Sequence, residues 1–471
     1  MPEIRLPDEF ITETRKPIHY ESEHSMVLKS GRISFRTVTE DCFIYGEDGA
    51  PEATVTSISY LRTDVQGPRP VMFFWNGGPG SATNTLHLQC FGPWLIDSDD
   101  KGVFSYGLHE DPDCLLDVCD LVFVDPVNVG YSRIFDKSKV MKYASVDGDA
   151  RSVAFFMLDW LLKHHRWDSP VYICGESYGT IRACRVLAEL GRSPYSESRK
   201  LPGLPVRGVV LVGVACGTDV LEPGLDLGAA MLPGMAATNW YHHPQGKGEQ
   251  MEFVQAAWEF AKHELIPALF DGDDCTDARL RAAAEKYAHF TGMPTEYFIK
   301  NRLVLQSADD FMTAVVAAEG SRVDVYDSRV TSPLDMPYNL VGDTNVPLLV
   351  MNGLLAERLG VGRERLYYTG NLTLNPYWQN EGEPLPPHGK PKTHMECLRG
   401  AMLANKDMRL LVANGLYDLC THAGNSWYIF SHAGLPRERV TQKNYFGGHG
   451  VYSTPEGKAQ FLSDIRELIK G

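Results

Sequence analysis

Five residues near the middle of the chain, Gly175-Glu176-Ser177-Tyr178-Gly179, fit the pattern Gly-x-Ser-x-Gly. A serine in this pattern sits on a tight turn between a strand and a helix, and small residues on both sides allow the turn. The apolar run Val171 to Cys174 predicts the strand, and apolar side chains that recur on one face from Ile181 to Ala188 predict the helix. The pattern therefore predicts that Ser177 is a nucleophile, although a Gly-rich turn with an idle serine would fit the letters alone.

A serine hydroxyl attacks a carbonyl only when a base takes its proton, and an acid must hold that base in one tautomer. With this type of turn, the acid follows a late strand and the histidine lies in the last loop before the final helix. Asp418 follows the apolar run Met408 to Ala413, and His449 lies in a Gly-Gly-His-Gly loop before a C-terminal helix. Each residue alone would more often be structural. Their order and placement predict Asp418 as the acid and His449 as the general base.

A second Gly-rich loop, Asn76-Gly-Gly-Pro-Gly80, directly follows the apolar run Val71 to Trp75. In hydrolases with a serine on a strand-to-helix turn, a loop near the nucleophile supplies one backbone N–H of the oxyanion hole. Glycines let such a backbone approach the reacting carbonyl. A simple turn would also use these residues, so the motif alone leaves both interpretations open.

Short apolar runs along the chain predict strands that are buried on both faces, as in a parallel sheet covered by helices. These runs are residues 71–75, 121–124, 171–174, 209–214, 408–413 and 440–446. Residues 16–62 instead alternate apolar and polar positions, which predicts antiparallel hairpins. The order of elements predicts an α/β-hydrolase fold, a mostly parallel central sheet with an antiparallel N-terminal start and an inserted, largely helical cap.

The alternation of strand and helix is lost in the middle of the chain, where Met, aromatic, Pro and charged residues dominate predicted helices such as 251–270. It returns from residue 408, and a last helix opens at Thr454-Pro455. We therefore predict that residues 1–220 and 392–471 form the two parts of one hydrolase core and that residues 221–391 form the inserted cap.

Several separate motifs occur along the chain in the order in which a known family has them. Asn-Gly-Gly-Pro-Gly at 76–80, Val-Asp-Pro-Val at 124–127 with Gly-Tyr-Ser at 130–132, Gly-Glu-Ser-Tyr at 175–178, Asp418 with Cys420, and the Gly-His-Gly loop together resemble the serine carboxypeptidase family. The match runs in order from about residue 70 to the end of the chain. It implies removal of single residues from peptide C-termini.

The resemblance also implies roles for residues around Ser177. The backbone N–H groups of Gly78 and Tyr178 would form the oxyanion hole, and Asn76 and Glu176 would bind the terminal carboxylate of the substrate. A protonated Glu176 can share its proton with a carboxylate, as two acids at close range must. Trp75 is assigned to substrate binding with them.

The sequence departs from the family pattern at three positions. In well-known secreted members a second glutamate pairs with the one beside the serine, and Cys90 stands at its position here. Phe74 replaces the usual Trp, with Trp75 following, and Gly450 replaces the usual Met after the histidine. Without the second carboxylate, we expect activity to follow the ionisation of His449 and to favour neutral or mildly alkaline pH. If the optimum were acidic, Glu176 would need another partner, which we expect on the cap.

The composition argues against some classes of partner. The chain has 471 residues, 44% apolar and 22% charged, and a net charge of -15 with no stripe of Lys and Arg, so nucleic acid is an unsuitable partner. The apolar runs are too short to span a membrane, and the first fifteen residues do not resemble a signal peptide. Together with a region at 232–241 that resembles bacterial members, these features predict a cytoplasmic, bacterial-type enzyme with reduced cysteines.

Metal and cofactor sites are not expected. No two cysteines have Cys-x-x-Cys spacing, and the acidic run at 271–274 departs from a calcium loop because Thr276 replaces the required Gly. The predicted triad and the resemblance imply that the partner is a peptide or a small acyl substrate. The oligomeric state stays open, with a homodimer as one alternative.

Two other functions are also compatible with the predicted triad. The same acyl-enzyme could pass its acyl group to an alcohol or an amine, or come from an ester, which would make the protein an acyltransferase or an esterase on a small molecule. The chain could also be an inactive binding protein on a hydrolase scaffold. Release of amino acids from blocked dipeptides distinguishes the first alternative, and fluorophosphonate labelling distinguishes the second.

Ser177→Ala is expected to abolish hydrolysis and fluorophosphonate labelling while leaving the fold intact, because a serine on an exposed turn contributes little packing. Asp418→Asn is expected to cost nearly as much, because it leaves His449 in the wrong tautomer. Turnover and labelling are measured on both variants beside the wild type. More than a trace of wild-type turnover in the Ser177→Ala protein would contradict the mechanism.

Overall fold

A nine-stranded sheet forms the centre of the structure, a computed structural model that describes residues 17–46, 48–98, 104–191, 204–217, 226–335, 345–363, 365–379 and 393–471. The last six strands in the sheet order run parallel, and the first three pair antiparallel. In order across the sheet they are β1 (His19–Leu28), β2 (Gly31–Tyr45), β3 (Pro51–Arg62), β7 (Asp120–Asp125), β4 (Val71–Trp75), β8 (Val171–Glu176), β9 (Val206–Val212), β12 (Arg409–Gly415) and β13 (Val440–Tyr445).

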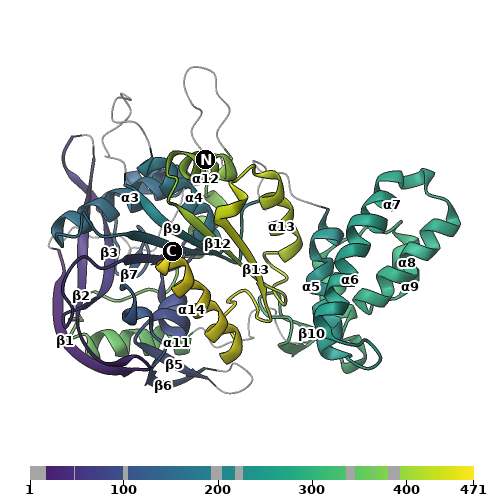
Figure 1. The fold of residues 1–471 in the computed structure, drawn as a ribbon, viewed down its shortest axis with the longest axis horizontal. Coiled ribbons are helices and arrows are strands. Elements are labelled where there is room, and N and C mark those ends of the chain that lie inside the picture. The colour runs from purple at the N-terminus through teal and green to yellow at the C-terminus, as the bar shows by residue number, and fades with distance from the viewer. Residues whose placement is uncertain are drawn as a thin grey trace.

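Helices cover both faces of the sheet, as Figure 1 shows. Successive side chains of a strand point to opposite faces, so Phe73 of β4 packs in one apolar cluster while Met72 and Phe74 pack in the other. The first cluster includes α2 (Val140–Tyr143), α3 (Val146–Lys163), α4 (Tyr178–Leu190), α12 (His394–Ala404) and α13 (Ala423–His432). The second includes α1 (Asn84–Leu86), α11 (Asn345–Gly353) and α14 (Pro455–Lys470).

The apolar runs became parallel strands and the alternating segment became β1 to β3, as predicted. The prediction that residues 440–446 form a strand buried on both faces was wrong, because β13 lies at the edge of the sheet and only Tyr445 in it is buried. The helix at the C-terminus begins where the sequence places it, since the Thr454 side chain accepts a hydrogen bond from the N–H of Gly457 and Pro455 occupies the first turn. A second hairpin, β5 (Trp94–Ser98) with β6 (Phe104–Glu110), was not predicted. Its outer strand is largely exposed, so it lacks the apolar run that marked the core strands.

The middle of the chain folds into helices around an apolar cluster of its own, and these helices project to one side of the sheet in Figure 1. They are α5 (Leu227–His242), α6 (Gln250–Phe260), α7 (Ile266–Asp271), α8 (Asp277–Thr291), α9 (Thr295–Lys300) and α10 (Ala308–Ala314). A short hairpin of β10 (Ser321–Val323) and β11 (Thr331–Pro333) follows. Leu416, Tyr417 and Leu419 from the loop after β12 join this cluster, so the projecting helices pack directly against the loop that carries Asp418.

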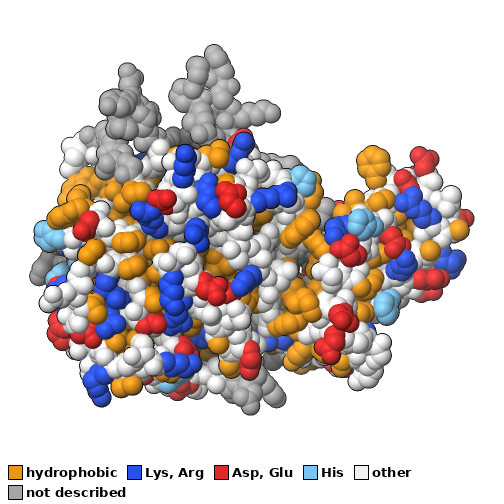
Figure 2. Space-filling model, viewed as in Figure 1, with side chains coloured by type: hydrophobic (Ala, Val, Ile, Leu, Met, Phe, Trp, Pro, Cys, Tyr) orange, Lys and Arg blue, Asp and Glu red, His pale blue; other side chains and the backbone are white. Residues whose placement is uncertain are grey.

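The boundaries of the predicted cap, at residues 221 and 391, lie outside the described residues and stay predictions. No helix among the described residues combines the length and the apolar character needed to cross a membrane. On the face shown in Figure 2, acidic and basic side chains are interspersed over both the sheet region and the projecting helices.

Candidate active site

Ser177 occupies the turn between β8 and α4, at the carboxyl ends of the parallel strands, where open α/β sheets place their ligands. Its backbone has φ 59° and ψ −130°, a conformation that a residue with a side chain rarely adopts. The turn is held because the Ser177 N–H donates to the Val212 carbonyl over 2.9 Å and its carbonyl accepts from the N–H of Thr180. This is the geometry of a nucleophile on a tight strand-to-helix turn.

The turn is packed so closely that glycine is required beside it. A Cβ at Gly175 would lie 2.2 Å from the Gly179 carbonyl oxygen. A Cβ at Gly77, in the loop after β4, would lie 2.4 Å from the backbone nitrogen of Tyr178 and 2.9 Å from Cβ of Ser177. The Gly-rich loop therefore lies directly against the backbone that follows the serine.

The predicted oxyanion donors lie at this contact. Tyr178 is the first residue of α4, so its N–H lies at the positive end of the helix. Gly78 follows Gly77 in the loop and adopts φ 103°, which glycine tolerates and other residues do not. The loop that carries Gly78 therefore lies against the N-terminus of α4, and the resemblance implies that the backbone N–H groups of Gly78 and Tyr178 stabilise an oxyanion there.

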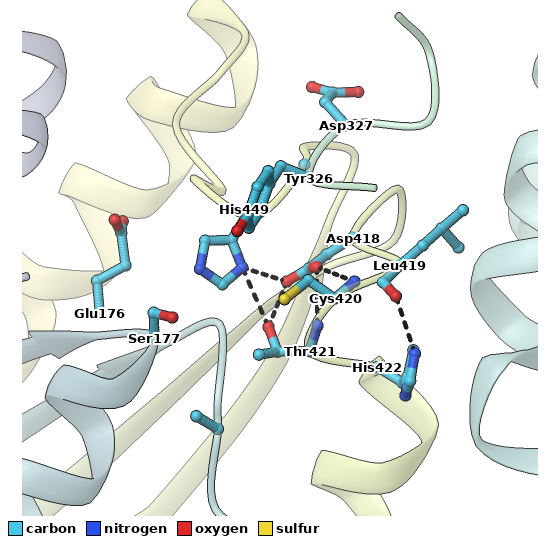
Figure 3. A network of polar contacts seen from close by, with 12 residues as sticks. Glu176, Ser177, Tyr326, Asp327, Asp418, Leu419, Cys420, Thr421, His422 and His449 are labelled. Carbon is cyan, nitrogen blue, oxygen red and sulfur yellow. Dashed lines mark hydrogen bonds and ion pairs between the residues drawn. The ribbon is translucent and has the colours of Figure 1, made fainter. Parts of the chain in front are cut away.

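The structure brings Asp418 and His449 together from the loops after β12 and β13. Nδ1 of His449 donates to Oδ2 of Asp418 over 2.8 Å, and both side chains are buried or nearly so. Figure 3 shows the imidazole with Asp418 on one side and with Ser177 and Glu176 on the other. The ring nitrogen that does not contact Asp418 is therefore the one turned toward the serine, as a general base requires.

Three further groups hold Asp418. Its Oδ1 accepts hydrogen bonds from the backbone N–H groups of Cys420, over 2.8 Å, and Thr421, over 2.9 Å. The Thr421 hydroxyl donates to Oδ2 of Asp418 and lies 3.2 Å from Nδ1 of His449. Burial alone would raise the pKa of Asp418, but the charge and hydrogen bond of His449 and the bonds from Thr421 lower it below its ordinary value. The acid is therefore ionised at neutral pH.

His449 is more basic than an ordinary histidine. Its burial alone would lower its pKa, but the charge and hydrogen bond of Asp418 and the charge of Glu176 outweigh burial and raise the pKa to about 9. Because only the neutral imidazole accepts a proton from Ser177, a raised pKa moves the rise in activity toward alkaline pH. The rise of activity with pH, expected from the sequence near the ordinary pKa of histidine, should therefore occur at a more alkaline pH.

A segment before β11 packs over the histidine loop. The backbone N–H of His449 donates to the Tyr326 carbonyl over 2.6 Å, and the rings of the two residues meet edge to face with centroids 5.3 Å apart. Leu419, next to Asp418, donates its N–H to the Val325 carbonyl over 2.9 Å. This segment, residues 325–330, therefore joins both triad loops to the helical region, and the Tyr326 side chain is 55% exposed beside the imidazole.

Asn76 and Glu176 form the pair that the resemblance implies. Nδ2 of Asn76 donates to Oε1 of Glu176 over 2.7 Å, and Oδ1 of Asn76 accepts from the N–H of Leu86, which fixes the orientation of the amide. The Arg182 guanidinium donates to the Asn76 carbonyl over 2.5 Å and is itself paired with buried Asp149. Asn76 is therefore held rigidly next to the turn that carries Ser177.

Sequence reasoning missed Tyr452, which makes the second contact of Glu176. The Tyr452 hydroxyl donates to Oε2 of Glu176 over 2.5 Å. Tyr452 follows His449 by three residues in the core, so this partner of Glu176 comes from the histidine loop and not from the cap. A tyrosine in a loop has no pattern that marks it, and its distance from Glu176 along the chain hides the contact.

Trp75, the last of the predicted site residues, and Cys90, which stands where the family has an acid, are both fully buried. The Trp75 side chain is 0% exposed, and its indole N–H donates to the Gly179 carbonyl over 2.8 Å. A buried indole offers no surface to a substrate, so the structure places Trp75 beneath the turn as its support. Cys90 is also buried, and it lies near enough to Glu176 for the carboxylate to raise the pKa of its thiol, although burial is the larger cause.

Among the residues that the structure describes, no group of three or more His, Cys, Asp or Glu side chains is arranged to hold a metal ion. The chemistry available at this site is that of the serine, the imidazole, the two carboxyl groups and the backbone N–H donors.

Comparison with known proteins agrees with this arrangement. The serine carboxypeptidase family model matches residues 60–261. Serine carboxypeptidase-like 47 of Arabidopsis thaliana is 26% identical over 162 residues, 34% of this chain and 29% of that protein. Serine carboxypeptidase-like 5 of the same plant is 24% identical over 179 residues, 37% of this chain and 39% of that protein. The aligned parts thus span about a third of the length of these curated relatives.

A solved structure extends the likeness to nearly the whole chain. The prohormone-processing carboxypeptidase Kex1(delta)p from Saccharomyces cerevisiae has 12% sequence identity and a TM-score of 0.54, and the match covers 92% of this chain and 91% of that protein. The sheet, the order of its strands and the turn at Ser177 define an α/β-hydrolase fold. Within that fold class, the chain is similar to the serine carboxypeptidase family over residues 60–261.

Thr421→Val tests whether the threonine hydroxyl positions the acid and the histidine. Valine keeps the shape of the side chain and removes the donor to Asp418, so kcat is expected to fall about tenfold with little change in KM, since hydrogen bonds to charged groups are worth about 1.5–3 kcal/mol. Steady-state kinetics on an activated ester measure the change.

Thr291→Val is the matched control, because that buried hydroxyl bonds only backbone groups at the end of α8. A Thr421→Val enzyme with wild-type kcat, or an equal loss in both variants, would remove Thr421 from the positioning groups.

Proposed function

We propose that the protein is a serine carboxypeptidase that releases C-terminal amino acids from peptides through an acyl-enzyme on Ser177. The observation that carries this proposal is the Asn76–Glu176 pair, a buried carboxyl group with an amide donor beside the nucleophile and the general base. An esterase needs no such pair to attack its substrate. A peptidase that acts at a chain end needs a group that receives the terminal carboxylate.

The proposed reaction proceeds in two steps. His449 takes the proton of the Ser177 hydroxyl as its oxygen attacks the last peptide carbonyl, and the N–H groups of Gly78 and Tyr178 stabilise the oxyanion. His449 then gives that proton to the leaving amine, which departs as the free C-terminal amino acid. Water next loses a proton to His449 and attacks the acyl-enzyme; the bond from the acyl carbon to Ser177 breaks, His449 returns the proton to the serine oxygen, and the shortened peptide leaves with a free carboxyl group. Asp418 holds the imidazole and stabilises its charged form throughout.

The carboxyl group of Glu176 decides which chain end fits. When it is protonated, Glu176 can donate a hydrogen bond to a substrate carboxylate, and Nδ2 of Asn76 can add a second donor. When it is ionised, it repels that carboxylate. Burial raises the pKa of Glu176 above its ordinary value, although His449 and the bonds from Tyr452 and Asn76 oppose the rise and Asp418 adds to it. The raised pKa favours the form that binds a carboxylate.

Asn76→Ala tests the recognition of the chain end. A blocked dipeptide with a free C-terminal carboxylate should be cleaved faster than its amide, and the variant should reduce the ratio of the two kcat/KM values by about tenfold or more, because a donor to a charged group is lost. The ratio is measured within each protein, so general damage to the site cancels.

Equal kcat/KM values for the free acid and the amide in the wild type would contradict carboxypeptidase function. That result would leave hydrolysis of esters or acyl transfer to a small molecule, for which the same triad suffices.

A further inference from the structure

Glu176 is held by two neutral donors, one on each carboxyl oxygen. Asn76 donates to Oε1 over 2.7 Å, and Tyr452 donates to Oε2 over 2.5 Å. Glu176 is 3% exposed and Tyr452 is 5% exposed, so water does not replace either donor freely. In a dry site, a hydrogen bond to one protonation state of a carboxyl group changes its pKa strongly.

The charged and titratable groups near Glu176 come from four parts of the fold. Those that face it are His449, Asp418, Tyr452, Cys90 and Cys174. Lys458 and Asp111 lie near Cys90 and pair with each other over 2.9 Å. Among the described residues that face Glu176, only His449 can carry a positive charge, so the two groups titrate as a coupled pair.

We propose that Tyr452 controls the protonation of Glu176, and through it both the basicity of His449 and the pH range over which a terminal carboxylate is accepted. The second of these effects rests on the proposed carboxypeptidase function. The first does not, because the charge of Glu176 acts on the imidazole whatever the substrate is.

The direction of the effect follows from the chemistry of a phenol. Burial is the main cause that raises the pKa of Tyr452 well above its ordinary value, and the charge of Glu176 adds to the rise, so the hydroxyl stays a donor at every working pH. A donor stabilises the ionised form of Glu176. A second carboxyl group at the same oxygen would act in the opposite direction, because two neighbouring acids share a proton and one of them stays neutral to higher pH.

Tyr452 therefore limits the rise in pKa that burial imposes on Glu176. In the singly protonated pair it shifts the proton from Glu176 to His449, and a protonated His449 cannot act as a base. The same shift leaves Glu176 ionised, which disfavours a substrate carboxylate. At the low-pH end of the activity profile, Tyr452 therefore lowers the fraction of His449 that can act as a base. It also weakens the binding of a terminal carboxylate there.

Tyr452→Phe tests this inference with a probe that needs no knowledge of the substrate. The rate of inactivation by a neutral fluorophosphonate is measured against pH, because phosphonylation of Ser177 requires neutral His449. In Tyr452→Phe, Glu176 holds its proton more often, so the acid limb of the profile should move toward lower pH by on the order of one unit. Glu176→Gln removes the charge of residue 176 at every pH, so its profile gives the largest shift that loss of this charge can cause.

Tyr445→Phe is the matched control. Tyr445 is equally buried, and its hydroxyl donates over 2.6 Å to the carboxylate of Asp464, a pair on β13 and α14 that does not include the triad. Its profile should match the wild type. An unshifted profile for Tyr452→Phe, or an equal shift in Tyr445→Phe, would overturn the inference.

A second measurement separates this inference from the proposed function. For a blocked dipeptide, the preference for the free acid over the amide should persist to higher pH in Tyr452→Phe than in the wild type. If the inactivation profile shifts but neither protein prefers the free acid, control of His449 by Tyr452 stands and carboxypeptidase function fails. If the wild type prefers the free acid and the inactivation profile does not shift, the function stands and the role of Tyr452 fails.

Discussion

The close contact between the loop after β4 and the turn after β8 is the constraint on which the rest of the site depends. Backbone atoms of Gly77 and Tyr178 lie so near each other that no Cβ fits at Gly77. The contact brings together the serine, the helix N-terminus and the loop of Gly78, which we propose as the second oxyanion donor. It also sets Asn76 beside Glu176, because each residue borders one of the two segments. Buried Trp75 and Arg182 hold the contact from below through bonds to the Gly179 and Asn76 carbonyls.

This constraint places one imidazole between two buried carboxyl groups. His449 bonds Asp418 on one side and faces Glu176 on the other, and both charges raise its pKa. Asp418 is a fixed anion, since four donors surround it. Glu176 is the adjustable one, because burial and its hydrogen bonds act on its pKa in opposite directions. Asp418 therefore supplies the larger and constant part of the rise in the His449 pKa, and Glu176 supplies the part that changes with its own protonation.

Local pattern was sufficient to predict the sheet and the turn at Ser177, because each depends on residues that are near one another in the sequence. Asp418 and His449 were predicted from their places after late strands, which the order of elements in the fold defines. Thr421 was missed although it follows Asp418 by three residues, a spacing at which side chains often bond the backbone of a turn and each other. Tyr326 and Tyr452 could not be found in this way. Their contacts join segments that only the folded sheet brings together. Trp75 was misplaced because a strand residue beside a site can face the core as easily as the substrate.

Cys90 stands where the resemblance places an acid, and Tyr452 decides what this replacement does to the protonation of Glu176. Without Tyr452, Glu176 would be a buried carboxyl group with one amide donor, and it would stay neutral to higher pH because only that donor and the charge of His449 would oppose the effect of burial on its pKa. That state binds a carboxylate well, but it removes a negative charge from beside His449. Tyr452 gives the carboxyl group a second donor without adding a second acid, so Glu176 can ionise while it stays buried. Glu176 thus has two donors, the amide of Asn76 and the phenol of Tyr452, and neither is a second acid that could share its proton.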